Sequence, residues 1–160
     1  MNQTEFEARV LSLTQDMYRV AAGLLRSSCD RQDAIQESIW KAWRQLRYLR
    51  DDDKFRPWLM RILVNECRNL YRKKQREVPV EEIEGAGEDP HTDYDRDEAL
   101  HEAMEKLPEK MRLAIILYYM DGFTTREMAQ ILRVPESTVK SRLRLGRIRL
   151  RELLGKEVEA

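Results

Sequence analysis

The chain has 160 residues, of which 42% are hydrophobic and 36% are charged, and its 29 basic residues balance its 29 acidic ones. This length suits one domain or two small ones, and six Gly and five Pro are few for an all-β protein with many turns. No apolar run approaches the ~20 residues needed to cross a bilayer, and no secretion signal is visible, so we expect a cytoplasmic protein without membrane insertion. The two cysteines form no CxxC motif, so we expect neither a disulfide nor a zinc scaffold.

Three helices are predicted in the first 76 residues. Apolar side chains from Phe6 to Leu24 recur at intervals of three and four, which predicts one long helix. A second helix is predicted from about Arg31 to Leu46, with Trp43 on its buried stripe, and residues 47–55 are predicted to form a loop. Pro57 suits the first turn of a third helix, because that turn does not need its missing N–H.

Residues 77–96 contain two Pro, two Gly and many acids, which predicts a flexible acidic linker that keeps two domains apart. After it we predict a helix from about Asp97 to Leu107, a second one opened by Pro108, a third that begins with a T-x-x-E capping box and ends at Leu132, and a last one over about 137–154. Strand periodicity is absent. The predicted fold is therefore all-α, with an N-terminal helical bundle (1–76) and a C-terminal helix-turn-helix domain (97–160).

The zero net charge conceals three segments of alternating sign. Residues 54–76 contain eight bases and one acid, residues 77–98 ten acids and one base, and residues 133–151 seven bases and one acid. Cationic segments suit a partner with a phosphate backbone, but ordinary exposed helices are often basic too. Charge alone therefore leaves a nucleic-acid partner open.

The strongest local pattern lies between Thr124 and Arg151, where a capped short helix, a tight turn and a longer basic helix are typical of a DNA-binding helix-turn-helix. In the major groove such a helix offers Arg and Lys to guanine edges and Ser to phosphates or bases. An αα-hairpin with a solvated basic face is the alternative. The predicted DNA-binding residues of this helix are Ser137, Thr138, Lys140, Ser141, Arg142, Arg144 and Arg147.

Three segments carry a family resemblance. LPEKMRLAIILYYMDGFTTREMAQILRVPESTVKSRLRLGRIRLRELL (107–154) resembles the C-terminal domain of bacterial RNA polymerase sigma factors, especially the extracytoplasmic-function (ECF) class. DRQDAIQESIWKAWRQL (30–46) resembles the family's core-polymerase-binding helix, and FRPWLMRILVNECRNLYRKKQR (55–76) resembles its promoter-melting and −10-recognition helix. The resemblance implies a transcription initiation factor that binds core RNA polymerase, directs it to specific promoters through a duplex −35 element and helps to open the −10 region.

The second predicted helix places an aromatic side chain among charged ones on a face distinct from its buried stripe. An apolar anchor with a charged rim is typical of a protein interface, and the resemblance implies the clamp coiled coil of the polymerase's largest subunit as the partner. The alternative is that Trp40 packs within its own bundle. The predicted core-polymerase-binding residues are Asp33, Gln36, Glu37, Trp40 and Arg44.

The third predicted helix carries a polar, mainly basic face that suits the phosphates of the −10 region, with Asn65 or Asn69 reading a base edge. In the family, the loop before this helix captures a base flipped out of the −10 element; here Tyr48 and Phe55 could stack on it, and an acid of the Asp51–Asp53 run could accept from an exocyclic amine. Capping of the next helix is the alternative role for these acids. The predicted −10-binding residues are Tyr48, Asp52, Phe55, Arg61, Asn65, Arg68 and Arg72.

Other classes of function fit less well. The two histidines, His91 and His101, pair with no cysteine, and no nucleophile elbow, P-loop or ordered metal-ligand cluster is visible, so we expect no enzyme, cofactor or metal. A stand-alone helix-turn-helix regulator of duplex DNA is the serious alternative, although it would leave the N-terminal motifs without a purpose. An anti-sigma factor as a further partner is implied by the resemblance alone.

Overall fold

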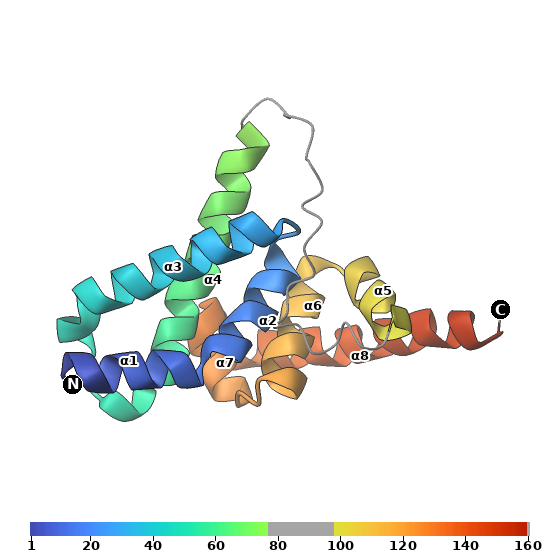
Figure 1. Ribbon diagram of the computed structural model, residues 1–160. Coiled ribbons are helices and arrows are strands. Elements are labelled where there is room, and N and C mark those ends of the chain that lie inside the picture. Colours follow the sequence, from blue (N-terminus) through green and yellow to red (C-terminus); the bar gives the residue numbers. More distant parts are fainter. Residues whose placement is uncertain (77–97, 160) are drawn as a thin grey trace.

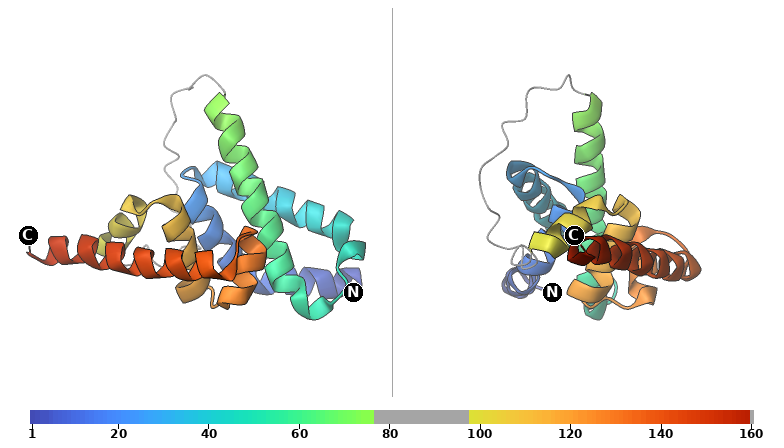
Figure 2. Two further views of the ribbon diagram at one scale, coloured as in Figure 1. Left: turned by 180° about the vertical axis from the view of Figure 1, so that it is seen from behind. Right: turned by 90° about the vertical axis from the view of Figure 1, so that its right-hand side faces the viewer.

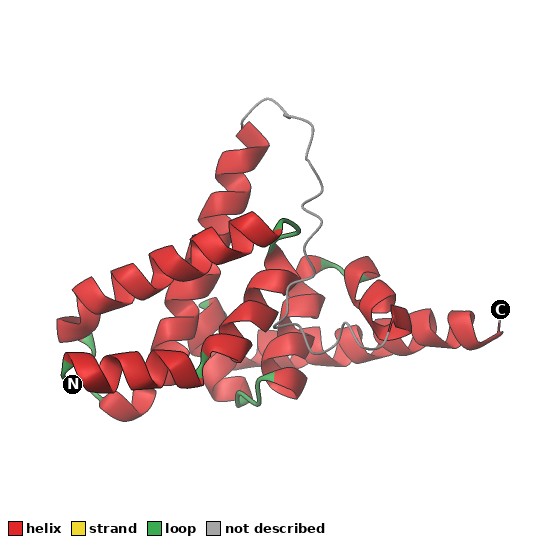
Figure 3. Cartoon of the chain, in the orientation of Figure 1, coloured by secondary structure: helices red, strands yellow, loops and turns green. Residues whose placement is uncertain are grey.

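A computed structural model describes residues 1–76 and 98–159, with side chains as far as residue 155 (Figures 1 and 3). These described residues form helices joined by short turns and contain no strand, so the predicted all-α class is confirmed. The predicted linker at 77–96 lies outside them.

The N-terminal half contains four helices, and its first stretch differs from the prediction. In place of one long helix there are two, α1 (Gln3–Ser12) and α2 (Thr14–Leu24), which take different directions in Figure 1. They meet at buried Leu13, whose N–H donates to the carbonyl oxygen of Val10 at 3.0 Å. The apolar spacing continues through this break, so periodicity alone could not reveal it.

Local capping sets the limits of the next helices. Helix α3 (Ser28–Gln45) begins earlier than predicted, because the Ser27 hydroxyl accepts from the N–H of Asp30 at 3.4 Å. The predicted loop contains two short 3₁₀ turns, η1 (Leu46–Tyr48) and η2 (Asp52–Lys54). Helix α4 (Phe55–Arg76) follows, with Pro57 in its first turn as predicted.

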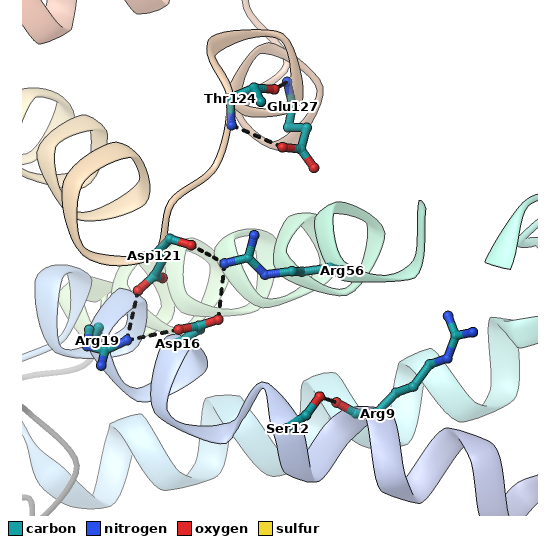
Figure 4. Close-up of polar contacts among 8 residues, drawn as sticks. All are labelled: Arg9, Ser12, Asp16, Arg19, Arg56, Asp121, Thr124 and Glu127. Atoms are coloured by element: carbon teal, nitrogen blue, oxygen red, sulfur yellow. Dashed lines mark hydrogen bonds and ion pairs between the residues drawn. The ribbon is translucent and has the colours of Figure 1, made fainter. Parts of the chain in front are cut away.

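The C-terminal half follows the predicted order. Helix α5 (Glu98–Lys106) precedes α6 (Glu109–Ile115), which runs on as a π-helical segment, η4 (Ile116–Met120), and Gly122 ends it with a φ of 72°. Helix α7 (Thr125–Leu132) begins with the predicted capping box, in which the Glu127 N–H donates to Thr124 Oγ1 and the Thr124 N–H donates to Glu127 Oε1, both at 3.0 Å (Figure 4). Helix α8 (Glu136–Glu159) completes the helix-turn-helix.

The two halves pack against each other, whereas the linker was predicted to keep them apart. Helix α7 lies against α4, and α2 lies against α6 and η4 (Figure 2). Gly23 permits the close approach of α2, because a Cβ there would lie 2.5 Å from Cδ1 of buried Ile116. The Arg112 guanidinium also donates from Nε to the Gly23 carbonyl oxygen at 2.8 Å. Buried apolar residues of both halves therefore form one continuous core.

We expect a leucine at Gly146 to destabilise the C-terminal half. Gly146 is buried where α8 crosses α6, and a Cβ there would lie 3.2 Å from Ile115 Cγ1 and 3.5 Å from Met111 Cβ. A larger side chain must push the helices apart, at a cost of about 1–3 kcal/mol in the free energy of unfolding. Urea unfolding of Gly146→Leu measures this cost.

The matched control is Gly155→Leu in the same helix, where a Cβ would have no atom of the described residues within 4 Å. Both substitutions replace a helical glycine by a better helix former, so the gain in intrinsic helix propensity is common to the two variants. Equal unfolding free energies for the two variants would contradict the packing role of Gly146.

Candidate nucleic-acid and protein interfaces

The outer face of α3 exposes an aromatic side chain with a charged surround. Trp40 is 57% exposed, and the Cζ of Arg44 lies 5.5 Å from its ring centroid. Arg44 Nη2 is also 4.0 Å from Glu37 Oε1, and Asp33 and Gln36 are exposed on the same helix. The structure thus gathers the predicted residues on a solvent-facing surface and does not pack Trp40 within the bundle.

Trp43 is less exposed than Trp40 but more exposed than was predicted. It was assigned to the buried stripe, but it is 39% exposed while its ring lies 5.1 Å from that of Phe6, centroid to centroid. The ring therefore closes the edge of the core and leaves one side in solvent. This position extends the apolar surface beside Trp40.

The turn between α3 and α4 separates two aromatic residues that were predicted to act together. Tyr48 is 66% exposed, with the Arg47 Cζ 5.0 Å from its ring centroid, so its ring is available for stacking. Phe55 is 2% exposed and packs edge-on against Phe6 at 5.7 Å between centroids. Contrary to the prediction, Phe55 is a core residue here, because the first turn of α4 directs it inward.

The acids of this turn divide between capping and exposure. The Asp51 carboxylate accepts from the N–H of Asp53 at 3.0 Å, which is the capping role left open by the sequence. The Asp52 side chain is half exposed, and the Asp52 backbone carbonyl accepts a hydrogen bond from Arg9 in α1. Helix α1 thus contacts the turn through Arg9, and the carboxylates of both Asp52 and Asp53 remain exposed, that of Asp52 at 4.0 Å from the N-terminal ammonium group.

The basic face of α4 lies where the two halves meet. Burial and the positive charge of Arg133 lower the pKa of Arg61 below its ordinary value. Arg68 Nε lies 3.8 Å from Glu109 Oε1 of the C-terminal half, and Asn65 is half-buried between them on α4. Arg72, one turn further on, is exposed. In this arrangement the C-terminal half partly covers the predicted −10-binding face.

Helix α8 exposes most of its predicted DNA-binding residues. Lys140 and Arg144 are exposed on it, as are Ser137, Ser141 and Arg147, whereas Thr138 is half-buried. Val139 and Leu143 are buried, on the side of α8 that packs against α5, α6 and α7.

Three contacts hold the ends of this exposed surface. Thr125 Oγ1, in the first turn of α7, donates to Glu136 Oε1 at 2.8 Å, and the same oxygen lies 3.8 Å from Lys140 Nζ. Further along α8, Arg147 Nη1 donates to Tyr119 Oη at 2.9 Å. The first of these contacts joins α7 to α8, the second lies within α8, and the third joins α8 to η4.

Arg142 departs from the rest of the predicted set on α8. It is half-buried and turned towards α4, and burial together with the positive charge of Arg68 lowers its pKa. The prediction included Arg142 in the DNA-binding set. Its actual environment depends on the packing of the two halves, which the sequence pattern did not indicate.

A polar cluster that the sequence did not predict joins the halves (Figure 4). Arg19 Nη1 in α2 donates to Asp16 Oδ1 at 2.9 Å and to Asp121 Oδ1 at 3.3 Å. Arg56 Nη2 in α4 donates to Asp16 Oδ2 at 3.2 Å and to the backbone carbonyl of Asp121. The Arg56 Cζ also lies 3.9 Å from the ring centroid of Phe123. The side chains of Asp16, Arg19, Arg56 and Asp121 are here called the interdomain polar cluster.

The Asp121 carboxyl group has an unusual environment. Its side chain is fully buried, and Oδ2 has no hydrogen-bond partner within the described parts of the chain. Burial, assisted by the negative charge of Asp16, raises its pKa from 3.8 to about 8, although Arg19 and Arg56 act in the opposite direction. The neutral acid is therefore favoured in the folded chain at neutral pH.

We expect the stability of the closed structure to fall as the pH rises from about 4 to about 8. The folded pKa of Asp121 exceeds its unfolded value, so the folded chain binds the proton more tightly; this stabilisation is complete below the unfolded pKa and is lost as the pH approaches about 8. Thermal unfolding at a series of pH values tests this. Asp121→Asn keeps an acceptor for Arg19 and cannot ionise, so its Tm is expected to vary less with pH. If the Tm of Asp121→Asn and that of the unmodified chain depend on pH in the same way, Asp121 does not titrate in this pH range.

The described residues contain neither a candidate membrane span nor a candidate metal site. No helix there is both long and apolar enough to cross a membrane. No group of three or more His, Cys, Asp and Glu side chains in the same part of the chain is arranged to hold a metal ion.

Comparisons with known proteins match both halves. The family model for Sigma-70 region 2 matches residues 10–77, and the model for Sigma-70, region 4 matches residues 97–150. The RNA polymerase sigma factor SigV of Bacillus subtilis is 31% identical over 134 residues, which cover 81% of this chain and 78% of SigV. The ECF RNA polymerase sigma factor SigM of Mycobacterium tuberculosis is 32% identical over 143 residues, covering 88% and 72% of the two chains.

Solved structures agree with these sequence matches. The sigma factor RpoE from Bartonella quintana, in complex with the anti-sigma factor NepR, superposes with a TM-score of 0.75 at 25% identity, over 94% of this chain and 97% of RpoE. CnrH, in complex with the cytosolic domain of CnrY, gives a TM-score of 0.73 at 26% identity, over 97% and 90% of the two chains.

Proposed function

Because this chain belongs to the ECF class of RNA polymerase sigma factors, we propose that its two halves divide the work of that class between them. It is a transcription initiation factor that binds core RNA polymerase, directs it to specific promoters and helps to open the −10 region. Residues 1–76 would bind core polymerase and the −10 element, and residues 97–160 the −35 element. RNA synthesis itself would remain the polymerase's reaction.

The observation that carries this division is the exposure of the predicted contact residues on two separate helices. On α3, Trp40 offers a large exposed aromatic surface with Glu37 and Arg44 beside it, which supports docking on core polymerase. On α8, Lys140 and Arg144 face solvent from a helix whose opposite side is buried, which supports reading of the −35 element in the major groove.

For the opened −10 strand we assign the stacking role to Tyr48 alone, with Asp52 as the acceptor for a base. Arg61, Asn65, Arg68 and Arg72 would follow the backbone along α4. Since Arg61 and Arg68 face Arg133 and Arg142 in the closed structure, we infer that the halves separate before α4 receives DNA.

An anti-sigma factor is the further partner that we propose. The RpoE structure was solved with the anti-sigma factor NepR, and the CnrH structure with the cytosolic domain of CnrY, and both sigma chains superpose on nearly the whole of this one. A regulator of this kind would control access to the two DNA-binding faces.

The experiment that tests the function is association of the purified chain with bacterial core RNA polymerase, followed by transcription from a promoter library. Stable association with new, sequence-dependent initiation is expected. DNA footprinting with and without core polymerase separates the alternative: tight binding to duplex DNA alone, without association with core, would identify a stand-alone regulator.

A further inference from the structure

A cleft of about 420 Å³ opens between α4 and the C-terminal half, and cations from both halves line it. Arg68 and Arg72 come from α4, Lys110 from α6 and Arg142 from α8; these four residues define the cationic cleft. Among the residues that the structure describes, the one acid in its lining is Glu109, whose Oε1 lies 3.8 Å from Arg68 Nε. Four positive groups therefore share one carboxylate.

The charges of the cleft oppose the packing that creates it. Arg68 and Arg142 face each other across the boundary between the halves, as Arg61 and Arg133 do nearby. Like charges brought together repel, one carboxylate offsets only part of this repulsion, and partial burial strengthens it because less water screens it. An anion between Arg68 and Arg142 would turn this repulsion into attraction.

The lining also fits an anion of a particular kind. Arg guanidinium groups present paired N–H donors that match phosphate oxygens, and a Lys ammonium adds a compact charge. Because the cations come from three different helices, a chain of several phosphates can reach more of them than a single phosphate can. The volume lies within the range of about 300–1,000 Å³ that is usual for small-ligand sites.

We propose that the cationic cleft binds a small polyphosphate anion, either inorganic or the phosphate chain of a nucleotide, and that this anion holds the two halves together. Arg68 and Arg72 bind it from one half, and Lys110 and Arg142 from the other. Three of these residues are also assigned to promoter contacts, so an occupied cleft competes with DNA. That competition rests on the proposed function, whereas binding to the free chain does not.

Isothermal titration of the full chain with sodium tripolyphosphate tests the site, with sodium sulfate at equal ionic strength as the reference anion. We expect saturable binding of one tripolyphosphate per chain, tighter than that of sulfate. Lys110→Ala should lower the affinity about tenfold or more, because it removes a charged donor to the phosphate chain. Arg142→Ala should do the same.

The matched control is Lys106→Ala, which removes an exposed lysine at the end of α5, outside the cleft. It should retain the affinity of the unmodified chain. Lys110 is exposed and has no assigned contact with promoter or polymerase, so its substitution should leave both the fold and transcription unchanged. Thermal unfolding of each variant checks that the helices remain folded.

ATP in place of tripolyphosphate distinguishes the two sources of the anion. Tighter binding of ATP would assign its base to the part of the lining that contains Tyr71, and equal affinity would assign the site to the phosphate chain alone. Tripolyphosphate that binds no more tightly than sulfate, or equal affinities of the Lys106→Ala and Lys110→Ala variants, would overturn the proposal. These titrations contain neither polymerase nor DNA, so their failure would leave the proposed function untouched.

Discussion

Replacing Glu37 and Trp40 together by alanine is expected to abolish binding to core RNA polymerase and to leave the helical fold intact. Trp40 is 57% exposed and Glu37 is about half exposed, so their removal takes little from the core of the free chain. Truncation of an aromatic anchor at the centre of an interface typically costs about 2–4 kcal/mol of binding free energy. With the neighbouring charge also lost, the affinity for core should fall at least about a hundredfold.

Fluorescence anisotropy of the labelled chain, titrated with core polymerase, measures this loss. The control is the double variant Glu7→Ala with Leu11→Ala on α1, where a similarly spaced acid and an apolar residue with 74% exposure are assigned to no interface. Normal binding by the Glu37/Trp40 variant would show that core polymerase docks elsewhere.

Arg144→Ala is expected to reduce promoter-directed transcription strongly without weakening the association with core polymerase. Arg144 is exposed near the middle of α8, opposite the buried Val139 and Leu143 side. A good bidentate contact with a base is worth about 1–3 kcal/mol of discrimination, which corresponds to roughly a tenfold or larger loss at a specific promoter.

Transcription in vitro by the reconstituted holoenzyme, on a promoter selected from the library, measures this effect. Arg149→Ala provides the control, because it removes the same charge from an exposed site on the same helix that is assigned to no DNA contact. If the two variants lose equal activity, the charge of α8 matters and the position of Arg144 does not.

Local features of the fold were predictable because their causes lie within a few residues of one another. The capping box of Thr124 and Glu127 and the position of Pro57 in a first turn both follow from short-range chemistry. The break at Leu13 did not follow, since no Gly or Pro marks it and the apolar spacing runs through it. An apolar residue buried at a junction between two helices fits the same three- and four-residue spacing as one buried within a single helix.

Some features of the candidate interfaces were likewise predictable from the sequence, and others were not. Exposure of Trp40 and of Arg144 could be inferred, because each helix presents one buried and one polar side. The burial of Phe55 could not, since it depends on the tertiary packing around the start of α4, and neither could the approach of Arg142 to Arg68, since it depends on the packing between the halves. Arg19 and Asp121 are 102 positions apart, so no local motif could indicate their contact.

The interdomain polar cluster also affects the apolar surface that is exposed when the two halves separate. Asp16 lies in the N-terminal half together with both of its guanidinium partners, so their contacts do not depend on the C-terminal half. When the halves part, Asp121 loses both guanidinium partners and water can hydrate its carboxylate, while Arg19 and Arg56 each keep their contact with Asp16. The apolar surface uncovered beside Gly23 and Ile116 is thus bordered by paired, hydrated charges, which favours a soluble open form that can close again without aggregation.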